Sequence, residues 1–130
     1  MRERPLSPHL TVYRMSRYSL LTSFTNRVTG LLLSAGFLML VCWLTALARG
    51  PRAYARVHEA FGAPLYKLVY AVLLAAFAYH LIAGIRHLIW DSGRGLEKAQ
   101  SQRSAWAVLL ASLLLAVLLI YWALMSRVGT

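Results

Sequence analysis

The stretch "VTGLLLSAGFLMLVCWLTALA", residues 28–48, decides the fold of this protein, because its 21 residues include no charged side chain. As a helix rising about 1.5 Å per residue, such a segment crosses the roughly 30 Å hydrocarbon core of a bilayer. Two more uncharged stretches follow, residues 68–85 with 18 residues and residues 104–126 with 23. The sequence therefore predicts an all-α integral membrane protein with three transmembrane helices.

The spans divide the chain into three parts. We place the membrane-crossing helices at about residues 28–48, 66–88 and 104–126, within a three-helix domain that occupies residues 28–126. A polar or mixed N-terminal segment, residues 1–27, precedes this domain, and a short tail, residues 127–130, follows it. No small-residue cleavage site follows the first span, so we expect this span to stay in the mature protein rather than to be removed as a signal peptide.

Basic residues predict the orientation and the surroundings of the chain. Residues 1–27 and 86–103 hold five and four Lys or Arg, while residues 49–67 and the C-terminus hold four and one. The split of nine against five places the N-terminus on the cytoplasmic side. The net charge is +10, but it is divided among short loops beside apolar spans. We therefore expect contact with anionic lipid head groups and no binding of nucleic acid.

A histidine inside the second span is the most informative residue of the sequence. His80 lies six residues before Arg86, which places it about 9 Å below the charged boundary of the span. At helical spacing Ala76, His80, Gly84 and His87 share one face, and the small side chains beside the imidazole leave space for a planar macrocycle. A haem iron held by His80 would need its second axial ligand from a partner helix. The alternative is a histidine that only hydrogen-bonds a neighbouring helix.

The other polar residues near the membrane boundary allow two interpretations each. Ser23 and Arg27 are one helical turn apart, on the same side of the membrane as His87. A hydroxyl and a guanidinium fork suit a quinone carbonyl or a haem propionate, but Ser23 could instead cap a helix and Arg27 could extend to lipid phosphates. Small residues on the spans, Gly30, Ser34 and Ala83 among them, fit either ordinary helix packing or contact with a flat ligand.

Three motifs resemble one known family. "RPLSPHLTVYR" at residues 4–14, "SFTNRVTG" at 23–30 and "HLIAGIRHLIWD" at 80–91 are similar, in this order, to the cytochrome b subunit of succinate dehydrogenase. The resemblance covers almost the whole chain. It implies one membrane anchor of respiratory complex II, a non-flavin subunit without a complete active site of its own, in a bacterial or mitochondrial inner membrane.

The resemblance also implies cofactors and partners. His80 matches the axial ligand of haem b, which is shared with a second membrane-anchor subunit, and His87 matches a histidine near that haem. Ser23 and Arg27 match positions that line the ubiquinone pocket, and Arg27 also approaches a haem propionate. The iron–sulfur subunit would deliver electrons from a flavoprotein subunit that holds FAD, and residues 7–9 would lie at the contact with the iron–sulfur subunit.

One residue departs from the family pattern. The family usually has a histidine near the haem propionates where this chain has Asn26, an amide that can still donate two hydrogen bonds. Two other functions stay open at this point. One is the anchor of a fumarate reductase or of a complex II without haem, in which menaquinone could replace ubiquinone. The other is a structural or assembly protein of the membrane with no redox site.

Overall fold

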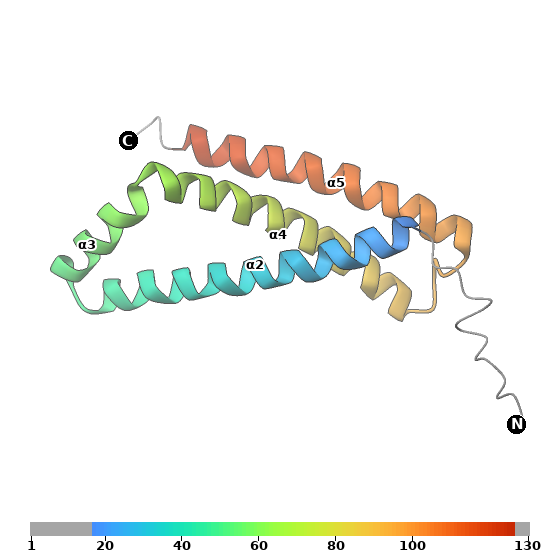
Figure 1. Ribbon diagram of the computed structural model, residues 1–130, viewed down its shortest axis with the longest axis horizontal. Helices are drawn as coiled ribbons and strands as arrows, with labels where there is room; N and C mark the ends of the chain where they lie inside the picture. The colour runs from blue at the N-terminus through green and yellow to red at the C-terminus, as the bar shows by residue number, and fades with distance from the viewer. Residues whose placement is uncertain (1–16, 127–130) are drawn as a thin grey trace, which may run out of the picture.

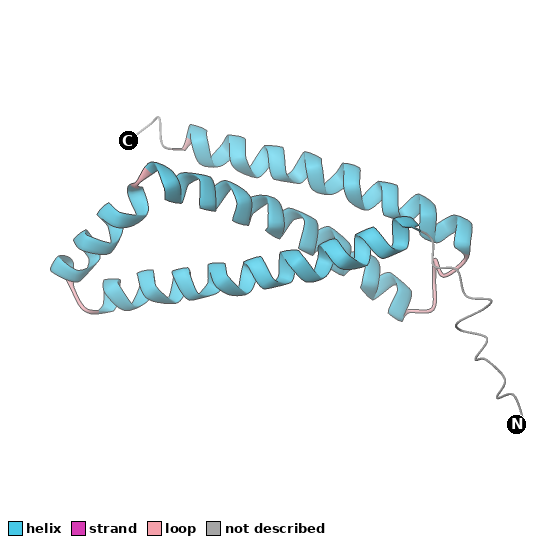
Figure 2. Ribbon diagram, viewed as in Figure 1, coloured by secondary structure: helices cyan, strands magenta, loops and turns pink. Residues whose placement is uncertain are grey.

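Four helices make up the described part of the chain, which is residues 17–126 of a computed structural model. They are α2 (Arg17–Ala48), α3 (Pro51–Gly62), α4 (Pro64–Asp91) and α5 (Lys98–Met125). Short loops join them, and no strand occurs in this range (Figure 2). The all-α fold class is thus confirmed. The motif at residues 4–14, including the proposed contact at residues 7–9, lies outside the described residues.

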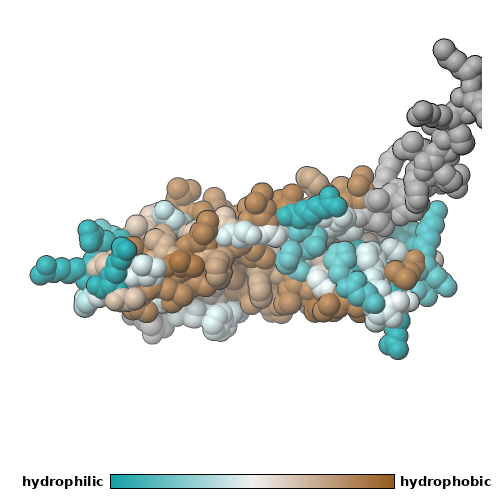
Figure 3. Space-filling view, turned by 90° about the horizontal axis from the view of Figure 1, so that it is seen from below, coloured by the Kyte–Doolittle hydropathy of each residue, from teal (hydrophilic) through white to brown (hydrophobic). Residues whose placement is uncertain are grey.

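The three long helices run side by side, and α4 contacts both of the others (Figure 1). Each is long and apolar enough to cross a membrane, over Leu20–Ala48, Pro64–Asp91 and Lys98–Met125. Apolar residues form the middle of the molecule, and hydrophilic residues gather toward its two ends (Figure 3). The start of α2, the end of α4 and the start of α5 share one end (Figure 1), which we call the Arg86 end.

The connection between the first two spans differs from the sequence-based expectation. Residues 49–67, which we expected as a loop, contain α3, a short helix that bridges the far ends of α2 and α4 (Figure 1). Gly50 makes the turn into α3 with φ +100°, a conformation that favours glycine. Pro64 begins α4, and because a proline disfavours a helical conformation in the preceding residue, Ala63 is extended and separates α3 from α4.

Small side chains build the interface between α4 and α5. Ala76 and Ala83 of α4 are buried, as is a stripe on α5 that recurs every three or four residues: Ala105, Val108, Ser112 and Ala116. Tyr79, Ala83 and Val108 form one buried cluster. Apart from Tyr79 these buried side chains are small or medium-sized, which allows two membrane helices to approach closely. For Ala83 the packing interpretation is therefore confirmed.

Candidate functional site

His80 lies where α4 faces the first half of α2. Its Nδ1 atom is 3.2 Å from the backbone oxygen of Asn26 and 3.3 Å from the hydroxyl of Thr29. The Thr29 hydroxyl is also 2.9 Å from the Thr25 carbonyl, to which it donates. Both groups on α2 can accept a hydrogen bond from an Nδ1–H, so the neighbours of His80 favour the tautomer that leaves Nε2 without a proton.

Gly30 allows the imidazole to approach α2. A Cβ atom at this position would lie 3.1 Å from His80 Cε1, which is tighter than ordinary van der Waals contact. Gly84, one turn after His80, has open space where a side chain would start. The two glycines therefore differ: the His80 ring occupies the space beside Gly30, whereas the space beside Gly84 is open.

A groove of about 770 Å³ runs along α2 beside His80. Its lining comprises His80 and the residues of α2 from Gly30 to Ala35, with Phe37 and Leu38. It is a wide and mainly apolar groove with one imidazole at its edge. These features fit a flat apolar macrocycle held by one axial nitrogen from this chain: the Nδ1 partners orient the ring, and the unprotonated Nε2 would serve as the ligand.

Ser23 and Arg27 lie on the same face of α2 as Gly30 and Ser34, which line that groove. Ser23 is half-buried and Arg27 is exposed. Within residues 17–126 neither side chain makes a hydrogen bond or an ion pair. Ser23 lies inside α2, which begins at Arg17, so the interpretation of Ser23 as a helix cap is wrong. Both side chains are available to a ligand or to another chain.

A buried arginine is the main feature that sequence reasoning missed. Arg86 is 6% exposed, and its guanidinium donates to Ser104 Oγ at 2.9 Å and to the backbone oxygen of Ser101 at 2.9 Å. It also donates to Thr22 Oγ1 at 3.1 Å, and its Cζ lies 4.0 Å from the centre of the Trp90 ring. Arg86 thereby joins all three long helices. The sequence did contain a signal for this network: Ser101 and Ser104 stand at the start of an otherwise apolar helix.

The other two residues that the sequence singled out are His87 and Asn26. His87 is half-buried and packs edge-to-face on Trp90, with 5.4 Å between ring centres. Asn26 has its side-chain oxygen buried with no hydrogen-bond partner. The Asn26 amide is thus a polar group at the family's histidine position that still lacks a partner for one atom.

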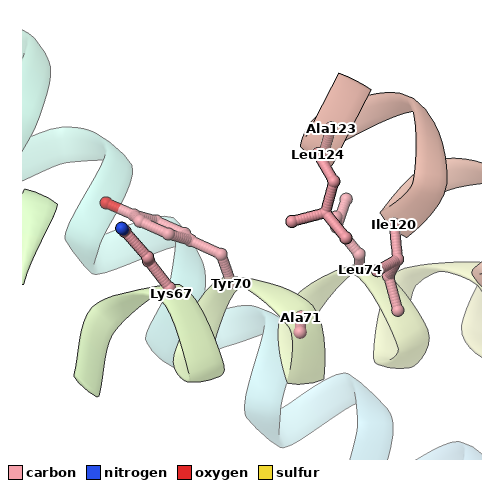
Figure 4. A pocket seen from close by; sticks show the side chains of 7 residues that line it. All are labelled: Lys67, Tyr70, Ala71, Leu74, Ile120, Ala123 and Leu124. Atoms are coloured by element: carbon pink, nitrogen blue, oxygen red, sulfur yellow. The ribbon is translucent and has the colours of Figure 1, made fainter. Parts of the chain in front are cut away.

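A second hollow, of about 270 Å³, lies between α4 and α5 near the far end of the molecule. In Figure 4 the Lys67 amine and the Tyr70 hydroxyl lie close together on one side, opposite Ile120 and Leu124. It contains no residue that the sequence singled out. The groove at His80 is therefore the better candidate site.

Comparison with known proteins identifies relatives over most of the chain. Residues 1–119 match the model of the succinate dehydrogenase/fumarate reductase transmembrane subunit family. A succinate dehydrogenase cytochrome b556 subunit of Paracoccus denitrificans is 41% identical over 115 residues, covering 88% of both chains. The corresponding subunit of Rickettsia conorii is 38% identical, with 90% of both chains covered. The human mitochondrial cytochrome b560 subunit is 34% identical, covering 85% of this chain and 66% of its own.

Proposed function

This chain belongs to the succinate dehydrogenase/fumarate reductase transmembrane subunit family, and from that premise we propose that it is the cytochrome b type membrane anchor of a succinate dehydrogenase. The observation that carries the proposal is the placement of His80. Its Nδ1 faces two acceptors on α2 and the ring borders an apolar groove. A histidine that served only to pack two helices would not need such a groove beside it.

His80 is the proposed axial ligand of haem b. The Asn26 carbonyl and the Thr29 hydroxyl would hold the imidazole plane and make Nε2 a stronger electron donor. Haem, when bound, supplies a one-electron redox centre. A haem with two axial ligands needs one besides His80, and the other membrane-anchor subunit would supply it. The exposed apolar faces of α2 are consistent with a partner helix on that side.

Ser23 and Arg27 are the proposed contacts of ubiquinone. They lie toward the Arg86 end of the face whose next turns line the groove, so a quinone there would be adjacent to the haem. The hydroxyl of Ser23 and the guanidinium of Arg27 can donate hydrogen bonds to a carbonyl oxygen. In a poorly hydrated site such donors stabilise negative charge that develops on the oxygen. Neither group has a competing partner among residues 17–126.

The wider assembly follows from the proposed function. The iron–sulfur subunit would contact the Arg86 end and deliver electrons, and the flavoprotein subunit would hold FAD and oxidise succinate. The basic N-terminal segment 1–27 would face the cytoplasm, or the matrix in mitochondria. The three-helix domain 28–126 would lie in the inner membrane, and the tail 127–130 would lie on the opposite side.

An optical spectrum tests the haem assignment. The complex is purified through a tag on this chain, and reduced-minus-oxidised spectra are recorded for the parent, His80→Ala and His58→Ala. His58 is an exposed histidine of α3 that stacks on Tyr54, so its variant is the matched control. We expect the b-type band to be lost only in His80→Ala. An assembled His80→Ala complex that retains the band would refute the assignment.

A kinetic measurement tests the quinone contacts. We expect Ser23→Ala and Arg27→Gln to lower succinate–ubiquinone reductase activity while succinate oxidation with a soluble dye stays unchanged. Arg103→Gln, on an exposed site of α5, is the control for the loss of one positive charge. If quinone reduction persists in Arg27→Gln while assembly of the complex fails, Arg27 has a structural role instead.

A further inference from the structure

A pocket of about 410 Å³ lies at the turn from α2 to α3, far from His80 along α2. Ala46, Ala53 and Val57 are its less exposed lining, and Cys42, Thr45, Arg49 and Arg56 form its exposed rim. The two arginines come from different segments, one from the end of α2 and one from α3. The turn at Gly50 brings the segments together.

Neither arginine has a counter-ion among the described residues. Within residues 17–126, Arg49 and Arg56 make no side-chain hydrogen bond and no ion pair. Residues 49–67 contain four basic residues and a single acidic one, Glu59. Two unpaired guanidinium groups on one pocket favour an anion with several oxygen atoms, such as a phosphate diester.

The position of the pocket specifies the kind of anion. Arg49 directly follows the membrane-crossing segment Leu20–Ala48, so the pocket lies where hydrocarbon meets head groups. From the arginines the lining continues to Ala46 and Cys42, one and two turns deeper into the span. A bound molecule would therefore have its charged part at Arg49 and Arg56 and an apolar part along α2, beside Ala46 and Cys42.

We propose that this pocket binds one anionic phospholipid, with the head-group phosphate between Arg49 and Arg56 and an acyl chain beside Ala46 and Cys42. Arg52 does not line the pocket, although it lies one helical turn before Arg56. The site is thus defined by two particular arginines and not by the general basic charge of α3. An acidic segment of a partner subunit could match the two positive charges, but it would leave the apolar part of the pocket without an apolar partner.

The test uses native mass spectrometry of the purified, delipidated complex, titrated with dioleoyl phosphatidylglycerol or dioleoyl phosphatidylcholine. Arg49→Gln and Arg56→Gln are compared with Arg52→Gln, which removes the same charge from α3 outside the pocket. We expect each pocket variant to weaken binding of the first phosphatidylglycerol about fivefold. Arg52→Gln should change it by less than about a factor of two.

Four results would overturn the proposal. The first is equal weakening by Arg52→Gln and Arg56→Gln, which would indicate a diffuse charge effect. The second is an equal preference of the parent complex for phosphatidylcholine. The third is release of a partner subunit by Arg49→Gln or Arg56→Gln with lipid binding unchanged, which would assign the pocket to a protein contact. The fourth is displacement of the lipid by inorganic phosphate added at equal concentration, which would indicate a free phosphate site.

Discussion

Arg86 and Thr22 are 64 residues apart in the sequence, yet Arg86 Nη1 lies 3.1 Å from the Thr22 hydroxyl in the buried part of the molecule. Through Ser101 and Ser104 the same guanidinium also holds the start of α5. Its partners in this network are neutral, so its charge is satisfied by hydroxyl and carbonyl dipoles. Arg86 is therefore the polar link among helices that otherwise pack through small apolar residues.

Removing this link should destabilise the fold. Arg86→Met leaves the hydroxyls of Thr22 and Ser104 without the guanidinium, and we expect a loss of about 2 kcal/mol in stability. Arg86→Lys keeps the charge but cannot reach all three partners, so we expect a smaller loss. The thermal midpoint at which this chain leaves the solubilised complex measures the effect. Arg103→Gln should melt like the parent, and a parent-like Arg86→Met would show that the network is not needed.

Thr29 should tune the proposed haem ligand. Thr29→Val removes the hydroxyl 3.3 Å from His80 Nδ1 and leaves the Asn26 carbonyl as the nearby acceptor. A weaker hydrogen bond at Nδ1 makes the imidazole less electron-donating, so the reduced haem is favoured. We expect the midpoint potential to rise by roughly 10–40 mV, measured by optical redox titration. Thr29→Ser should restore the parent value; a potential unchanged in Thr29→Val contradicts the tuning role.

Gly30 and Gly36 should respond differently to the same substitution. A Cβ at Gly30 meets the His80 ring at 3.1 Å, and a Cβ at Gly36 meets the Leu73 side chain at 2.8 Å. Gly30→Ala should shift the imidazole and change the electron paramagnetic resonance spectrum of the oxidised haem. Gly36→Ala should lower thermal stability by about 1 kcal/mol with that spectrum unchanged. Identical spectra for parent and Gly30→Ala would place the haem ligand elsewhere.

His87 should prove dispensable for haem ligation. Its ring packs on Trp90, and Trp90 in turn donates through Nε1 to the Gly95 carbonyl at 3.0 Å in the loop before α5. We expect His87→Ala to retain the b-type band at full intensity and to lower stability modestly, by about 1 kcal/mol. Haem content per complex and the thermal midpoint check this together. A lost band in a well-assembled His87→Ala complex would exchange the roles of the two histidines.

Much of the fold could be predicted from hydrophobicity, because a 20-residue apolar run has few alternatives to a membrane helix. Two things could not. α3 carries charges and small residues, so its short helix has no apolar run to mark it and depends on the turns at Gly50 and Pro64. The second is which face of α2 packs against α4. Helical spacing pointed to Ser23 and Arg27, but the buried contacts with α4 are made by Thr22 and Thr29, one or two positions away.

The placement of Arg86 also bears on how the chain is made. Thr22 precedes α4 in the chain, whereas Ser101 and Ser104 follow it, so these two serines leave the ribosome after Arg86. The guanidinium must stay near water or a translocon until the start of α5 arrives, since donors without acceptors are costly in hydrocarbon. Burial of Arg86 is thus coupled to the arrival of Ser101 and Ser104, which lie 15 and 18 residues further along the chain. We therefore expect α4 and α5 to enter the membrane together.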